Sequence, residues 1–150
     1  MSNRNVLKWL FCAVLGAAAL TPAQAAETPA KLAGVKIVTA EEVKQLLDSG
    51  VPVIDTRVAA EYAEKTIKGA KSVTYREKSA KAEDFDPSQD QFDLSKLPTD
   101  KAAPLVFFCN AGECWRSYKA SVVALKAGYK KIHWFRGGMP EWTGKGLPTQ

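Results

Sequence analysis

The sequence contains very little histidine and cysteine. Across 150 residues it has one histidine, His133, and three cysteines. His133 falls within a predicted strand, which argues against a catalytic pair of cysteine and histidine and places it on the strand surface. The chain also lacks internal repeats and low-complexity segments, which argues against a solenoid or a linker.

A long apolar run is also missing. The N-terminal run from Trp9 to Leu20 has twelve residues, whereas a membrane-spanning helix needs about 20. Arg4 and Lys8 precede this run and an alanine-rich segment ending at Ala25 follows it, which is the layout of a secretory signal peptide. We therefore predict that residues 1–25 are removed after export and that the protein is periplasmic or secreted, without a membrane attachment.

The remaining residues 26–150 match the size of one ordinary domain, which can bury a core without disulfides. Removal of the two N-terminal basic residues leaves 19 basic and 16 acidic residues, a net charge of +3. The basic residues are scattered among acidic ones, so we predict no nucleic acid binding, and we expect a monomer. Cys109 and Cys114 remain close together in sequence, which favours a functional role over a stabilising framework.

Apolar patterns predict alternating strands and helices along this domain. Strands are expected at residues 35–38, 51–54, 72–75, 104–108 and 131–135. Helices are expected after the capping box Thr39–Glu42, at 58–64, from near Arg116 and from Pro140. Residues 76–100 should be mostly loop with short helical pieces. This alternation implies parallel pairing, hence an open α/β sheet of five mainly parallel strands with helices on both faces.

Cys109 directly follows the most apolar predicted strand and precedes a helix, the position where open α/β sheets bind ligands. A thiol there faces the positive end of the helix dipole, which should lower its pKa. Gly112 can adopt a positive φ, so the loop amides can point inward as an anion nest, and Arg116 adds a fixed positive charge. Glu113 beside a thiolate acts in the opposite direction and disfavours anionic donors. A buried, unreactive cysteine is the alternative.

Three ordered motifs resemble the rhodanese-like sulfurtransferase family over about Ile37 to Leu147. The first combines Val53-Ile54-Asp55-Thr56-Arg57, Glu61-Tyr62 and Ile67-Lys68-Gly69-Ala70. The second combines Phe107-Phe108-Cys109-Asn110-Ala111-Gly112, Arg116-Ser117, Ala120, Leu125 and Gly128-Tyr129, and the third combines Phe135-Arg136-Gly137-Gly138 with Trp142. Each motif alone is weak, but their order and spacing favour the rhodanese-like fold.

The resemblance implies that Cys109 accepts sulfane sulfur from a donor such as thiosulfate and passes it to a thiol or another thiophilic acceptor, which can be a protein. The implied anion cradle consists of Asn110, Ala111, Gly112, Glu113, Cys114, Trp115 and Arg116. No metal and no organic cofactor are implied. Asp55 and Arg57 are interpreted as a supporting ion pair or helix cap rather than a general acid and base, with Glu61 as their partner. Arg57 can also assist an anionic substrate.

The sequence departs from the family pattern at two places. Lys65-Thr66 replaces the usual Gly-His, which affects a structural turn. Six residues separate Cys109 from Arg116, a longer interval than in the usual sulfurtransferase loop, so the pocket should be larger or differently shaped. The length of the loop therefore does not identify the substrate.

Cys114, which precedes a tryptophan, can act as a resolving thiol or be a spectator. As a resolving thiol it attacks the persulfide on Cys109, releases reduced sulfur and leaves a disulfide. Such a bond requires Cα atoms about 4.4–6.8 Å apart. Two further hypotheses remain open, namely a dithiol redox protein that cycles Cys109 and Cys114, and a non-catalytic rhodanese-fold binding module.

Overall fold

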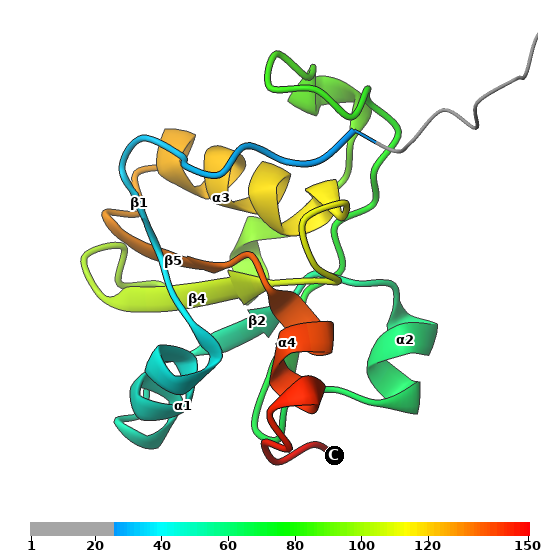
Figure 1. Cartoon of the computed structure of the whole chain (residues 1–150). Coiled ribbons are helices and arrows are strands. Elements are labelled where there is room, and N and C mark those ends of the chain that lie inside the picture. Colours follow the sequence, from blue (N-terminus) through cyan, green and yellow to red (C-terminus); the bar gives the residue numbers. More distant parts are fainter. Residues whose placement is uncertain (1–25) are drawn as a thin grey trace, which may run out of the picture.

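A parallel five-stranded sheet forms the centre of the molecule (Figure 1). The structure, a computed structural model, describes residues 26–150, and the predicted signal peptide lies outside them. The strands are β1 (Val35–Ile37), β2 (Val53–Asp55), β3 (Lys71–Ser72), β4 (Pro104–Phe108) and β5 (Lys131–Phe135). They follow the order β1-β5-β4-β2-β3 with parallel neighbours throughout. The predicted α/β class is confirmed.

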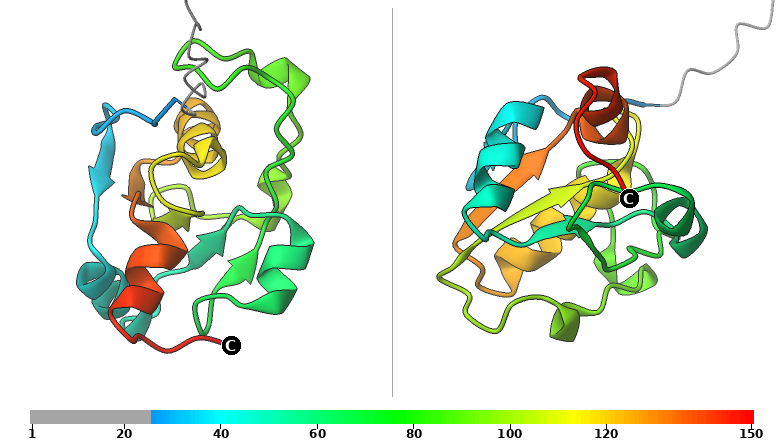
Figure 2. Two further views of the ribbon diagram at one scale, coloured as in Figure 1. Left: turned by 45° about the vertical axis from the view of Figure 1, so that its right-hand side comes forward. Right: turned by 90° about the horizontal axis from the view of Figure 1, so that it is seen from below.

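Helices lie on both faces of this sheet, as predicted (Figure 2). Their bounds are α1 (Ala40–Asp48), α2 (Ala59–Glu64), α3 (Trp115–Lys126) and α4 (Gly138–Gly144). On one face, Val43 of α1 and Trp142 of α4 join a core cluster with Val106 of β4. On the other face, Ala120 of α3 packs in a cluster with Phe107 of β4. The side chains of β4 therefore alternate between two separate cores.

The central position of β4 explains its continuous apolar sequence. Its residues Leu105 to Phe108 are all fully buried, because both faces of the strand are covered. Burial of one such large side chain contributes about 1.5–3 kcal/mol. The strand pairs with β2 on one side and β5 on the other, and it ends at the same sheet edge as both. This arrangement places the residue after Phe108 between two neighbouring strand ends.

The first helix begins where the local sequence predicts. Thr39 is the N-cap of α1, and its hydroxyl accepts a hydrogen bond from the Glu42 amide while the Glu42 carboxylate accepts one from the Thr39 amide. This reciprocal capping box satisfies two amides that the helix itself leaves without partners. The helix therefore starts at Ala40.

Two strand boundaries differ from the prediction. β2 starts at Val53 rather than at residue 51 and extends to Asp55, because Pro52 has no amide to donate and Asp55 still pairs with Phe108. β3 was expected at residues 72–75 but covers only Lys71–Ser72. It is an edge strand with one neighbour, so its ladder ends where the pairing with β2 ends.

The last helix also starts earlier than predicted, at Gly138 instead of Pro140. Gly138 has φ +56°, a conformation that favours glycine. A Cβ atom at this residue would lie 2.2 Å from the carbonyl oxygen of Cys109. The start of α4 therefore packs directly on the backbone of Cys109.

The segment from residue 76 to residue 100 is mostly loop, as predicted, with 3₁₀ turns at Pro87–Gln89 and Leu94–Lys96. It is attached to α3 through Lys119, whose side chain is fully buried. The Lys119 Nζ lies 2.9 Å from the Glu77 Oε2 and donates to the Ser79 hydroxyl at 2.8 Å. A buried ammonium group needs such partners.

None of the helices within residues 26–150 has the length and apolar character needed to cross a bilayer.

Candidate active site

Cys109 lies at the carboxyl edge of the sheet, directly after β4, as predicted. The carbonyl of Phe108 accepts hydrogen bonds from the amide and the hydroxyl of Thr56, at 3.1 and 2.8 Å. These bonds join the end of β4 to the segment after β2. The position of Cys109 is therefore determined by two strands at once.

Cys109 and Cys114 form a disulfide across the loop. Their Cα atoms are 6.3 Å apart, within the range of about 4.4–6.8 Å that a disulfide requires. Cys109 is 1% exposed, whereas Cys114 is partly exposed. The geometry thus allows the bond that the resolving role of Cys114 requires, and it makes the two sulfur atoms unequal in access.

Three carbonyl groups of the loop bind donors. The Cys109 carbonyl accepts from the Met139 amide at 3.0 Å, the Ala111 carbonyl accepts from the Cys114 amide at 3.2 Å, and the Gly112 carbonyl accepts from the Thr28 amide at 2.8 Å. In a trans peptide the following N–H points away from the carbonyl. The N–H groups that follow these carbonyls therefore point away from the three donors. They belong to Asn110, Gly112 and Glu113.

The positive φ expected at Gly112 occurs one residue earlier, at Ala111, with φ 42°. It is the only non-glycine residue with positive φ in the part of the chain that the structure describes. An L-residue in this region costs roughly 1–2 kcal/mol, so the surrounding contacts hold the loop in a strained conformation.

Helix α3 begins immediately after the loop, with Cys114 as its N-cap. The Cys114 side chain makes no capping hydrogen bond. The first amides of a helix have no partners within it and carry a partial positive charge. The loop that holds both cysteines is therefore followed by an uncapped helix amino terminus.

Glu61 of α2 connects the two ends of the loop. Its carboxylate accepts a short hydrogen bond from the Asn110 side chain and lies 3.7 Å from the Arg116 guanidinium. This corrects our assignment of Glu61 as the partner of Asp55 and Arg57. The Arg116 and Glu61 side chains are both about one-third exposed, so the ion pair contributes only about 0.2–1 kcal/mol.

Asp55 and Arg57 form a buried ion pair beside the site, as predicted. The Arg57 Nη2 donates to the Asp55 Oδ2 at 2.7 Å, and the Arg57 Nε donates to the same carboxylate. Arg57 also donates to the Lys65 carbonyl, and the Thr66 hydroxyl donates to Asp55 at 2.8 Å. The Lys65-Thr66 turn, one of the two departures from the family pattern, is thus bonded directly to this pair.

An N-terminal strap, defined as residues 26–28, lies against the loop, a contact that sequence reasoning missed. The Thr28 hydroxyl and amide both donate to the Gly112 carbonyl, at 2.7 and 2.8 Å. The Trp115 indole donates to the Ala26 carbonyl at 2.8 Å. Thr28 and Gly112 are 84 positions apart, and no local sequence pattern indicates such a contact.

Arg136, directly after β5, holds the strap in place. Its Nη2 donates to the Thr28 carbonyl at 2.8 Å. A Cβ atom at Gly112 would lie 2.8 Å from this same nitrogen, so the glycine makes room for Arg136. The Phe135-Arg136-Gly137-Gly138 motif contained this residue, but its sequence did not reveal the partner.

A hollow of about 240 Å³ opens beside the loop. Its lining residues are Glu77, Lys81, Asn110, Glu113, Cys114, Trp115 and Arg116. Five of these were predicted as cradle residues, whereas Glu77 and Lys81 come from the segment that Lys119 anchors. Trp115 is 3% exposed and packs with Tyr118 and Trp134 in a core cluster. It therefore belongs more to the core than the sequence suggested.

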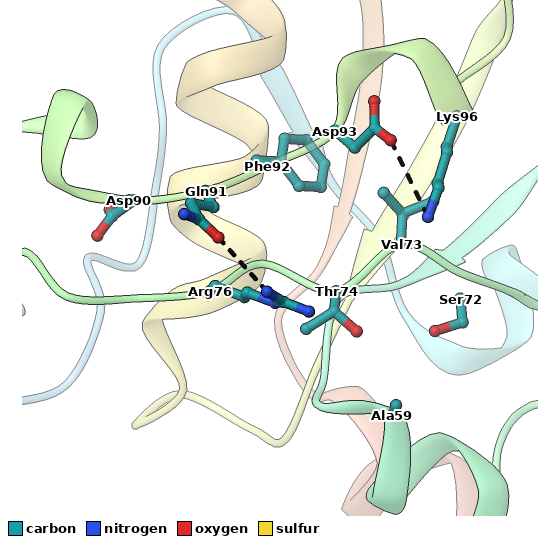
Figure 3. A pocket seen from close by; sticks show the side chains of 10 residues that line it. All are labelled: Ala59, Ser72, Val73, Thr74, Arg76, Asp90, Gln91, Phe92, Asp93 and Lys96. Carbon is teal, nitrogen blue, oxygen red and sulfur yellow. Dashed lines mark hydrogen bonds and ion pairs between the residues drawn. The ribbon is translucent and has the colours of Figure 1, made fainter.

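A larger hollow, of about 740 Å³, lies elsewhere (Figure 3). It is bordered by Ser72 and Thr74 near β3 and by Arg76 and Gln91, whose side chains are hydrogen-bonded at 3.5 Å. It contains no cysteine or histidine. Size alone therefore does not identify the site, and we assign it from the chemistry of the loop.

His133 lies in the middle of β5, in register with Lys36 of β1 and Val106 of β4, and it does not line the hollow beside the loop. Burial lowers its pKa. It is half-buried rather than on the strand surface, which corrects part of that prediction. Within residues 26–150, no group of three His, Cys, Asp or Glu residues is placed to hold a metal ion.

The rhodanese-like domain family matches residues 39–145. This match spans more than half of the chain, and the protein therefore belongs to the rhodanese-like domain family. The resemblance given by the three motifs is confirmed at the level of the family. No curated protein matches the chain by sequence.

Solved structures of three sulfurtransferases are similar to this fold. A human single-domain sulfurtransferase has 26% identity and a TM-score of 0.53, over 73% of this chain and 96% of that one. A polysulfide-sulfur transferase homodimer from Wolinella succinogenes has 24% identity and a TM-score of 0.56, over 79% and 80%. A thiosulfate sulfurtransferase from Pseudomonas aeruginosa has 21% identity and a TM-score of 0.57, over 77% of this chain but 20% of that one.

Proposed function

We propose that this protein is a sulfurtransferase or persulfide carrier that uses Cys109. The Cys109 thiolate attacks the outer sulfur of a donor such as thiosulfate, forming Cys109–S–S⁻ and releasing sulfite. An acceptor thiolate then attacks the terminal sulfur, takes it as a new persulfide and restores the Cys109 thiolate. Atoms and charge balance in both steps, and neither step needs a metal or an organic cofactor.

One observation carries this proposal: Cys109 follows a central strand and is bonded to the N-cap of α3, which has no side-chain cap. After reduction, a thiolate at this position is stabilised by the partial positive charge of the helix end. With three loop carbonyls bound to other donors, the amides of Asn110, Gly112 and Glu113 point away from those donors and can serve a persulfide anion. The Cys114 amide is already bonded to the Ala111 carbonyl. Arg116 adds a positive charge beside the loop, and the ion pair of Asp55 and Arg57 stabilises the neighbouring end of β2.

The family membership and the named activities of the similar structures support sulfur transfer as the general reaction. The donor proposed here is a small sulfur anion or a persulfide, and the acceptor is a thiol, on a small molecule or a protein. The hollow beside the loop is lined by two acidic and two basic side chains, and the acidic Glu113 directly precedes Cys114. Like charges reduce the affinity for an anion, so we expect slow turnover of thiosulfate itself.

The decisive experiment is mass spectrometry of the reduced protein after treatment with thiosulfate. We expect a gain of one sulfur atom on Cys109, and none in the Cys109→Ser variant. The Cys114→Ser variant is the matched control and should still gain the sulfur. Absence of the added sulfur from both the wild type and Cys114→Ser, with thiosulfate and with polysulfide as donors, refutes the proposal.

Export is part of the proposal. We infer cleavage after Ala25, release into the periplasm or the medium, and action as a monomer without membrane attachment. The N-terminal sequence of the protein recovered outside the cytoplasm should begin at Ala26. Recovery of a cytoplasmic protein that retains residues 1–25 contradicts this inference.

A dithiol redox function is the second candidate, and the disulfide between Cys109 and Cys114 favours it. In this case the two thiols lose two hydrogens together and pass two electrons to an oxidant. The mass measurement on Cys114→Ser separates the candidates. Without a resolving thiol, a sulfurtransferase keeps the added sulfur on Cys109, whereas a redox protein gains no sulfur.

A further inference from the structure

The two sulfur atoms of the disulfide differ in access. Cys109 is 1% exposed, whereas Cys114 is partly exposed and lines the hollow of about 240 Å³. A second hollow on the other side of Asn110 is lined by neither cysteine. A molecule that enters beside the loop therefore meets Cys114 and not Cys109.

The surroundings of Cys109 explain its burial. It follows β4 between the ends of β2 and β5. The start of α4 packs on it from the far side, where the Met139 amide binds its carbonyl at 3.0 Å. A Cβ atom added at Gly138 would lie 2.2 Å from this carbonyl oxygen, so the backbone of α4 leaves no room there for an approaching group. Access from that side is closed.

We propose that Cys114 is the point of attack through which a small thiol activates this protein. The incoming thiolate forms a bond to the Cys114 sulfur, and the bond between the two cysteine sulfurs breaks. The electron pair of that bond leaves with Cys109, which becomes a thiolate. A second thiolate then attacks the mixed disulfide, and the products are a small-molecule disulfide and the free Cys114 thiolate.

The leaving group permits this direction of attack, and the difference in exposure between the two cysteines favours it. Thiol–disulfide exchange is faster when the leaving thiol has a low pKa. Cys109 leaves as a thiolate next to the uncapped end of α3, where its charge is stabilised. This inference rests on the proposed function, because the thiolate released is the one that accepts sulfur. The oxidised protein is then a resting form in which Cys109 cannot receive sulfur.

The hollow also indicates the class of thiol. Lys81 and Glu113 line it and form no ion pair with any residue in the described part of the chain. Their opposite charges suit a small thiol that carries both an ammonium and a carboxylate group. Free cysteine has both groups, and we choose it as the probe.

The test treats the oxidised wild-type protein briefly with cysteine in the presence of iodoacetamide. The alkylating agent blocks the released thiol before the disulfide can close again. Cleavage by trypsin after Lys101 and Arg116 yields one peptide with both cysteines, and fragment ions locate each group. The control is the same reaction in guanidinium chloride, where both sulfurs are exposed and both should carry adducts.

We expect the cysteine adduct on Cys114 and the alkyl group on Cys109, exceeding the reverse arrangement by about tenfold or more, since exchange depends on access to the attacked sulfur. Equal or reversed labelling overturns the proposal, as does a folded protein in which neither cysteine reacts. Persulfide formation on the chemically reduced protein is measured separately. Failure of the entry route through Cys114 is therefore distinguishable from failure of the proposed function.

Discussion

Replacement of Gly138 by alanine tests how closely α4 packs on the active-site loop. Gly138 has φ +56°, and an added Cβ would lie 2.2 Å from the Cys109 carbonyl oxygen and 2.9 Å from the Ala111 amide nitrogen. Gly146 is the matched control, because its φ is +66° and an added Cβ would meet nothing within 4 Å. The two substitutions share the backbone penalty, and only one creates a contact.

The left-handed conformation costs alanine roughly 1–2 kcal/mol at either position. At Gly138 the loop must also move, which breaks the hydrogen bond from the Met139 amide to the Cys109 carbonyl, now 3.0 Å long. A buried carbonyl without a partner costs about 1–3 kcal/mol, to which the remaining close contact adds. We therefore expect Gly138→Ala to lose about 2–4 kcal/mol more free energy of unfolding than Gly146→Ala.

Urea denaturation followed by tryptophan fluorescence measures this difference. In a thermal scan, each kcal/mol should lower the midpoint by about 4 °C for a domain of this size. Persulfide formation on Cys109 should also decrease in Gly138→Ala and not in Gly146→Ala, because the loop is displaced in the first variant alone. Equal destabilisation of the two variants refutes the reasoning from close contact.

Three further predictions concern the elements that support the site. Asp55→Asn should cost about 3–5 kcal/mol in urea denaturation, because it leaves the buried Arg57 without its charge partner, whereas Asp48→Asn in an exposed ion pair should cost less than about 1 kcal/mol. Burial raises the pKa of Asp90, but hydrogen bonds, those from Ser79 first, outweigh burial and lower the pKa to about 2. A lowered folded-state pKa contributes stability above the unfolded value, so about 2 kcal/mol should be lost in acid titrations between about pH 4 and pH 2, and Asp90→Asn should lack this loss. Thr39→Ala should cost about 1 kcal/mol in urea denaturation by removing the cap of α1.

Each of these predictions has an outcome that contradicts it. Similar losses for the Asp55 and Asp48 variants would mean that the buried pair is not more important than an exposed one. Acid titration curves of the same shape for the wild type and the Asp90 variant would assign the acid sensitivity to other carboxylates. An unchanged unfolding free energy for Thr39→Ala, with Ser49→Ala at the other end of α1 as the control, would show that the capping box is not formed in solution.

Elements governed by neighbouring residues were predicted well. The start of α1 follows from Thr39 and Glu42, which lie within one helical turn of each other. β4 follows from a continuous apolar run, because a strand with two covered faces needs one. β3 was predicted too long, because the length of an edge strand depends on its single neighbour and not on its own sequence.

The candidate site was predicted in part. Cys109 and its loop were identified because a strand, a small polar segment and a helix follow one another directly in sequence. The predicted partner of Glu61 was wrong. Helix α2 places Glu61 against Asn110 and Arg116 rather than against Arg57. The positive φ was assigned to glycine on general preference, whereas the contacts around Ala111 impose it there.

By itself, the sequence determined the order of strands and helices along the chain and the cysteine at the end of β4, because these depend on residues within a few positions of one another. The order and spacing of three motifs indicated the family. The tertiary structure alone decided which sulfur faces the hollow and how the loop is held. Thr28 reaches Gly112, Arg136 reaches Thr28, and Gly138 reaches Cys109 only after the sheet has brought their elements together. Such contacts depend on the packing of separate elements, which no local pattern of residues encodes.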